Sequence, residues 1–144
     1  MYESLTTSQI VEFIAQSNSS SIPEQVLDII RISVLDYLGV ALVGSREPLG
    51  QIITQYVKEA GGQPEAGIIG GGFKTSVAQA AWVNGTTSHA IDYDDYSMAW
   101  QTHPSVVILP AILALGEKCH IPGRELLTSY AVGFEVGTRV YLRV

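Results

Sequence analysis

Cysteine is almost absent from this sequence, and its scarcity removes several classes of protein at once. Cys119 is the single cysteine among 144 residues. A disulfide framework, a four-cysteine zinc site and a cysteine-held iron–sulfur cluster all need more thiols than this chain has. Small secreted domains are rich in disulfides, whereas cytosolic proteins keep their few thiols reduced. We therefore expect a cytoplasmic protein without a cysteine-bound cofactor.

Charged residues are also scarce, and most of those present are acidic. They make up 15% of the chain, with 14 acidic against 8 basic residues and a net charge of −6. Binding to nucleic acid needs clustered lysine and arginine, so no nucleic-acid partner is expected. Hydrophobic residues account for 47% of the chain, which excludes intrinsic disorder because a disordered chain is poor in apolar residues.

Long hydrophobic runs are missing as well. The longest covers residues 106–115 and contains Pro110, whereas a membrane-spanning helix needs about 20 apolar residues. The first seven residues carry neither the basic segment nor the apolar core of a secretory signal. The sequence therefore predicts no membrane partner and a soluble protein.

The positions of capping and breaking residues predict an all-α fold of about six helices. Threonine or serine precedes several apolar repeats, proline stands where helices would start, and glycine stands where they would end. A short extended piece is expected at Ile68-Ile69, between glycines. The first predicted helix is capped by Thr6 or Thr7, the second covers 23–43, and the third runs from Pro48 to about Ala60. The fourth follows a cap at Thr75 or Ser76, the fifth covers 104–115, and the sixth runs from Pro122 to the C-terminus.

The second predicted helix is the most apolar element of the chain. One face follows the helical repeat through residues such as Val26, Ile30 and Tyr37, while Ile32 and Leu35 lie off that face. A helix that is apolar on most sides is usually buried at the centre of a fold. We therefore expect residues 23–43 to lie inside a helical core.

A glycine-rich segment at residues 67–75 is the one pattern that could suggest a nucleotide cofactor. A phosphate-binding loop needs glycine, lysine and serine or threonine in direct succession, because the lysine must reach the phosphates held by the loop. Phe73 separates glycine from lysine here, and no third glycine follows Gly70 and Gly72 at dinucleotide-binding spacing. The segment is interpreted as a flexible turn before a helix.

Histidines and acids gather between residues 84 and 105. His89, Asp92, Asp94, Asp95 and His103 all lie in this stretch, in an otherwise charge-poor sequence. Crowding would raise the pKa of at least one of the three carboxyls, and a carboxyl beside a histidine suits general acid–base catalysis. A solvated acidic loop and a structural His89 are the plain alternatives.

Anion binding and metal binding are two further functions that the same stretch could have. His103 stands just before a predicted helix start, where backbone amides and the helix dipole favour a bound anion. His89, Asp92 and His103 are residue types that bind metals, but their spacing matches no standard metal site. We expect no metal.

The same stretch resembles the MmgE/PrpD family, which includes 2-methylcitrate dehydratase, cis-aconitate decarboxylase and iminodisuccinate epimerase. The resemblance is carried by Val-Asn-Gly at 83–85, His-Ala-Ile-Asp-Tyr-Asp-Asp at 89–95 and His-Pro-Ser at 103–105. Leu-Asp-Tyr-Leu-Gly at 35–39 and Gly-Phe-Glu-Val at 133–136 support it. The resemblance extends over nearly the whole chain.

What the resemblance implies is a lyase or isomerase that acts on a small di- or tricarboxylate without metal or other cofactor. A 2-methylcitrate dehydratase-like activity is the first expectation. Asp92 and His103 are implied as catalytic residues. The implied substrate-binding residues are Tyr96, Ser97, His89 and Ser105.

Family members are much longer, so residues 1–144 are expected to form the N-terminal part of a helical domain. Further pocket residues would then lie beyond Val144, and the chain alone is expected to be inactive because residues that act as a unit fail together. Family resemblance implies a homodimer, and the apolar last helix suggests self-association or a complementary chain. An epimerase of the same family and a non-catalytic helical fragment that binds a partner remain the alternatives.

Overall fold

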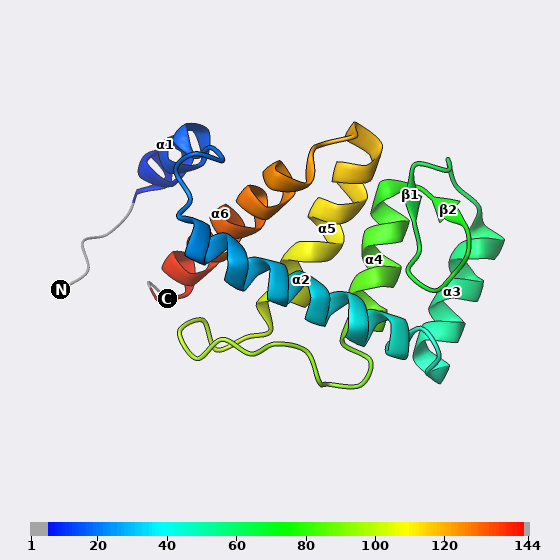
Figure 1. The fold of residues 1–144 in the computed structure, drawn as a ribbon. Helices are drawn as coiled ribbons and strands as arrows, with labels where there is room; N and C mark the ends of the chain where they lie inside the picture. The colour runs from blue at the N-terminus through cyan, green and yellow to red at the C-terminus, as the bar shows by residue number, and fades with distance from the viewer. Residues whose placement is uncertain (1–5, 143–144) are drawn as a thin grey trace.

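Six helices and one very small sheet make up residues 6–142, the part of the chain that the computed structural model describes (Figure 1). The all-α prediction is confirmed. Two strands of two residues each pair antiparallel, with Ala66 opposite Thr75. In chain order the elements are α1 (Thr7–Gln16), α2 (Glu24–Gly44), α3 (Pro48–Ala60), β1 (Ala66–Gly67), β2 (Lys74–Thr75), α4 (Val77–Ser88), α5 (Pro104–Cys119) and α6 (Gly123–Tyr141).

Helix starts follow from local capping chemistry. Thr6 caps α1 in a capping box, in which Gln9 bonds back to the cap backbone. The Ser76 side chain accepts the Gln79 N–H at the start of α4. Pro48 and Pro104 occupy first helical positions, where a missing N–H costs nothing. These predicted starts are confirmed.

Other predicted helix boundaries are shifted. Pro23 and Pro122 precede α2 and α6 as cap residues instead of opening them. Helix α5 continues past the predicted Leu115 to Cys119, and it ends where His120 adopts a left-handed conformation. Helix α6 is described to Tyr141, and the last two residues of the predicted helix lie outside the described part.

The predicted extended piece at Ile68-Ile69 is wrong by about two residues. The paired strands flank it, and residues 68–73 form the turn that joins them. Helix α4 holds this turn through Asn84, whose side chain accepts the Ile69 N–H at 2.9 Å and donates to the Gly67 carbonyl at 3.0 Å. Helix α5 holds it through Glu117, which accepts the Gly67 N–H at 2.7 Å.

Helix α2 crosses α4, α5 and α6, and the main core lies in this crossing (Figure 1). Tyr37 of α2, Leu109 of α5 and Tyr130 of α6 are all buried there. The prediction that residues 23–43 lie inside a helical core holds for one face of α2 only, because a second apolar face remains open: Ile32 is 68% and Leu35 71% exposed. Among the described helices, none combines the length and apolar character needed to span a membrane.

Close helix contacts at two glycines bring the ends of α4 and α5 to the same side of α2. A Cβ added at Gly85 of α4 would lie 3.3 Å from Pro110 of α5. A Cβ added at Gly44 of α2 would lie 1.9 Å from the carbonyl oxygen of Thr87. The loop that follows α4 therefore leaves from, and returns to, a tightly packed helix pair.

Candidate active site

The loop of residues 89–103 connects α4 to α5 and carries most of the residues predicted to be functional. It lies beside α2 in Figure 1 and begins and ends at the two packed helices. Its first residue, His89, caps the C-terminal end of α4, and its last, His103, caps the N-terminal end of α5. The fold thus brings together two histidines that are fourteen residues apart.

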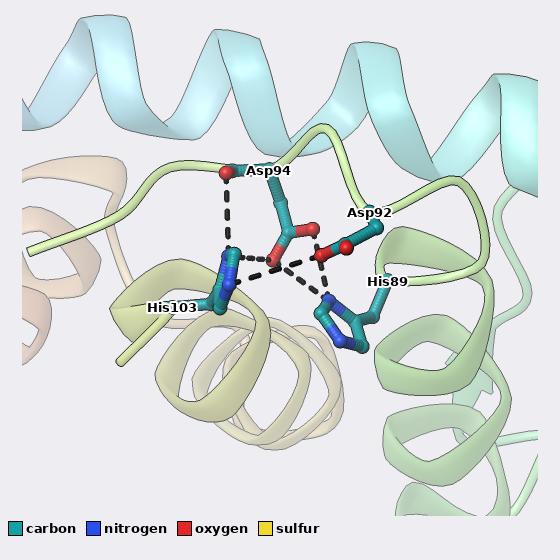
Figure 2. Close-up of side chains that lie close together, drawn as sticks. All are labelled: His89, Asp92, Asp94 and His103. Carbon is teal, nitrogen blue, oxygen red and sulfur yellow. Dashed lines mark hydrogen bonds and ion pairs between the residues drawn. The ribbon is translucent and has the colours of Figure 1, made fainter. Parts of the chain in front are cut away.

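Asp94 occupies the centre of the site, between the two histidine rings (Figure 2). Its side chain has no exposed surface. The Nδ1 atom of His89 lies 2.9 Å and 3.1 Å from the two Asp94 carboxylate oxygens. The Nδ1 atom of His103 lies 3.0 Å from Oδ2 of Asp94 and 3.3 Å from its backbone oxygen. The sequence indicated acid–base groups here but did not assign Asp94 a place among the site residues.

Asp92 approaches His103 from the other side of the ring. Its Oδ1 lies 3.9 Å from Nε2 of His103, and its side chain is 79% exposed. The Asp92 backbone has a φ of 51°, in the left-handed region that aspartate adopts more readily than most residues. This turn lets Asp92 and Asp94, two residues apart, both face His103. The structure therefore brings the two predicted catalytic residues together.

Asp95 points away from the histidines and binds the first turn of α5. Its carboxylate accepts the Ser105 N–H at 3.1 Å and the Ser105 hydroxyl at 2.6 Å. The Ser105 hydroxyl also lies 2.8 Å from that of Tyr130, whose pKa is raised by burial. The amide of Ser105 is therefore already occupied by a protein carboxylate, and binding of an anion at this helix start stays a prediction.

The predicted substrate-binding residues occupy different positions relative to the cluster. Tyr96 is 54% exposed and packs edge-on against His103, with ring centroids 5.4 Å apart. Ser97 bonds within the loop, donating its N–H to the Thr102 carbonyl at 2.9 Å and so pinching off the loop tip. Ser105 is fully buried. A direct substrate contact by Ser97 or Ser105 stays a prediction.

His89 also lines a pocket of about 510 Å³ between α4 and α5. Its walls include Leu49, Trp82 and Val107, whereas Asp92, Asp94 and His103 are not among them. His89 is 49% exposed, and it is the residue that this mainly apolar pocket shares with the histidine–carboxylate cluster. The position is compatible with the predicted role of His89 in binding substrate.

Negative charge accumulates on the side of the site that faces α2. Partial burial raises the pKa of the Asp36 carboxyl, and the charges of Asp95 and Asp94 raise it further. The cluster is suited to moving protons at histidine nitrogens.

The same four residues are also within reach of one cation. His89, Asp92, Asp94 and His103 each offer a ligand atom, and these atoms lie within 4.8 Å of one another. Imidazole and carboxylate are ligands that zinc and related metals accept. In this arrangement both Nδ1 atoms face the Asp94 carboxylate at hydrogen-bonding distance. The expectation of metal-free chemistry stays a prediction.

The fold and the site together define a class of protein: a helical domain in which one interhelical loop carries two histidines and two carboxylates. Residues 8–144 match the MmgE/PrpD N-terminal domain. The chain therefore belongs to the MmgE/PrpD family, as the motifs around His89 and His103 predicted.

Curated relatives carry names from the same family. The chain is 29% identical to the cis-aconitate decarboxylase-like protein oryM of Aspergillus oryzae, over 96% of the chain and 30% of that protein. It is 36% identical to cis-aconitate decarboxylase of Mus musculus, over 74% of the chain and 23% of the relative. It is 29% identical to cis-aconitate decarboxylase of Aspergillus terreus, over 93% of the chain and 28% of that protein. The chain spans less than a third of the length of these relatives.

Proposed function

We propose that this chain supplies the acid–base residues of a lyase that acts on a small di- or tricarboxylate without a metal. The observation that carries the proposal is His103, with Asp94 at its Nδ1 and Asp92 3.9 Å from its Nε2. Dehydration of a 2-methylcitrate-like substrate was the first expectation from the sequence. The names of the relatives add decarboxylation of cis-aconitate as an equal candidate.

Proton transfer at Nε2 of His103 is the chemical step that this geometry supports best. In dehydration, a base removes a proton next to a carboxylate and an acid protonates the departing hydroxyl. In decarboxylation, carbon dioxide leaves and an acid delivers a proton to the carbon that held it. Asp92 either orients the imidazole or transfers the proton itself, and a protonated His103 offsets substrate charge. Returning the proton to the opposite face would give the epimerase alternative.

Further protein surface is needed to enclose this open site. Exposed apolar faces on α2 and α3 indicate where that additional surface would bind. Ile32 and Leu35 on α2 and Ile52 and Tyr56 on α3 are each 59% exposed or more. Large uncovered apolar surface drives association. We propose that a complementary polypeptide or a second copy covers it and that the chain alone is inactive. A homodimer, a cytoplasmic location and a purely binding role stay predictions.

Turnover of 2-methylcitrate and cis-aconitate by the purified chain, alone and mixed with the remaining part of a family member, tests the proposal. We expect no turnover from the chain alone and turnover from the mixture. Asp92→Asn or His103→Ala should then reduce kcat by at least about 100-fold, the scale of a lost general acid or base.

His120→Asn is the matched control. It also removes a histidine, but at an exposed position where the left-handed backbone suits asparagine. It should leave turnover in the mixture unchanged. Full turnover by His103→Ala, or a folded mixture that converts neither substrate, would contradict the proposal, and the second outcome would favour a binding role.

A further inference from the structure

We propose that Asp94 is a positioning residue that fixes the tautomers of both site histidines. Its buried carboxylate would hold a hydrogen on Nδ1 of His89 and of His103, leaving both Nε2 atoms free to exchange protons. The catalytic meaning of this arrangement depends on the proposed function. The arrangement itself does not, because it follows from contacts within the chain.

The first argument is the donor and acceptor balance around Asp94. An ionised carboxylate accepts hydrogen bonds and cannot donate them. Nδ1 of His89 lies 2.9 Å from Oδ1 of this carboxylate, and Nδ1 of His103 lies 3.0 Å from Oδ2. Both ring nitrogens therefore carry hydrogen. In a neutral imidazole the other nitrogen, Nε2, is then unprotonated and can act as a base.

The second argument is burial. The Asp94 side chain has no exposed surface, and a buried carboxylate is costly unless it is hydrogen-bonded. The ion-pair partners of Asp94 among the described residues are His89 and His103. The carboxylate and the two rings therefore stabilise one another, and turning either ring over would replace its Nδ1 with a ring carbon and leave a carboxylate oxygen without that partner.

The third argument is a difference between the two histidines. The hydrogen bond of His103 at Nδ1 is to the backbone oxygen of Asp94 at 3.3 Å, whereas its 3.0 Å contact with the Asp94 carboxylate is an ion pair. The backbone oxygen remains whatever side chain residue 94 carries. The hydrogen bonds of the His89 ring in the described structure all go to the Asp94 carboxylate. Removing the carboxylate charge should therefore change the tautomer of His89 more than that of His103.

Nitrogen NMR of the histidine rings, recorded on the chelator-treated 144-residue chain, tests this directly. The measurement is made at mildly alkaline pH, above the ordinary histidine pKa. We expect the wild-type chain to show Nδ1–H tautomers for both His89 and His103. In Asp94→Asn, the amide offers one acceptor and one donor, so His89 should shift largely to the Nε2–H tautomer while His103 keeps Nδ1–H.

Asp95→Asn is the matched control, since it makes the same change one residue away. Asp95 contacts Ser105 and not the histidines, so this variant should lose stability and keep both tautomers. The proposal is overturned if either wild-type ring is found as Nε2–H. It is also overturned if Asp94→Asn leaves His89 unchanged, or if a metal in the untreated protein occupies Nδ1. The wild-type measurement decides the first point even where a variant fails to fold.

The outcome is independent of turnover. A tautomer shift in Asp94→Asn together with an inactive wild-type mixture would support the positioning role and refute the proposed lyase activity. Turnover by the wild-type mixture, together with unchanged tautomers in Asp94→Asn, would support the lyase activity and refute the positioning role. In an active mixture, Asp94→Asn should lower kcat more than it raises KM, because the positioned nitrogen acts in the chemical step.

Discussion

Replacing Gly44 by alanine tests the close approach of α2 to α4 at this glycine. A Cβ at this position would lie 1.9 Å from the Thr87 carbonyl oxygen and 2.9 Å from its carbon. Both are backbone atoms, so α4 as a whole must move away from α2 by more than about 1 Å. Overpacking of this kind costs about 3 kcal/mol. The better helix propensity of alanine returns about 1 kcal/mol, which leaves a net loss of about 2 kcal/mol.

Gly39→Ala provides the matched control on the same helix. Gly39 is exposed, and a Cβ there meets nothing within 4 Å. The change should therefore stabilise the chain by up to about 1 kcal/mol through helix propensity alone. The two variants would differ by about 3 kcal/mol, which for a domain of this size corresponds to about 10 °C in Tm. Urea and thermal unfolding followed by circular dichroism measure both.

An unchanged Tm in Gly44→Ala would refute the close α2–α4 contact. A destabilised Gly39→Ala would instead show that Gly39 is needed for a reason other than free space. The Gly44 variant has a second readout, because Thr87 lies two residues before His89. The NMR signals of His89 should move in Gly44→Ala, whereas those of the distant His120 should stay in place.

Two further predictions concern single polar groups outside the site. The Tyr37 hydroxyl is buried, and Ser88 lies close enough to lower its pKa although the two groups form no hydrogen bond of good geometry. Tyr37→Phe should therefore change the free energy of unfolding by no more than about 1 kcal/mol, and a larger loss measured by urea unfolding would show that the Ser88 contact is a full hydrogen bond. Lys74, and then the Gly67 N–H, lower the pKa of Glu117. A carboxyl whose pKa is lower in the folded than in the unfolded chain stabilises the fold at pH values above its unfolded pKa, and this stabilisation is lost as the pH falls through its folded pKa. Glu117→Gln should therefore cost about 0.5–1 kcal/mol at neutral pH and nothing in strong acid, and a pH-independent cost would contradict this assignment.

Helix starts were predictable because their signals are local. The Thr6 capping box and the Ser76 cap each involve residues three positions apart, so the sequence contains the whole interaction. The buried and open faces of α2 were less predictable. Leu35 and Tyr37 both lie in an apolar pattern, yet one is 71% exposed and the other fully buried. Which face is covered depends on helices far along the chain.

The candidate site was predictable in its residue types and less so in its geometry. His89, Asp92 and His103 were expected from their clustering in a charge-poor sequence and from the family motif. The different roles of Asp94 and Asp95 were not, because adjacent aspartates look alike in sequence. The left-handed turn at Asp92 and the packing of α5 direct one carboxylate to the histidines and the other to Ser105.

The backbone hydrogen bond between Ser97 and Thr102 divides the loop into a base and a tip, and the tip is anchored to α6 by Trp100, whose ring packs against Phe134. The base holds Asp94 and His103, whereas the tip contributes none of the clustered atoms. Lengthening a flexible loop costs little, about 0.6 kcal/mol for each doubling. Insertions between Ser97 and Trp100 would therefore leave the four clustered side chains in register, provided that Trp100 keeps its place against Phe134. The length of the loop tip and the arrangement of the clustered side chains can therefore vary independently of each other.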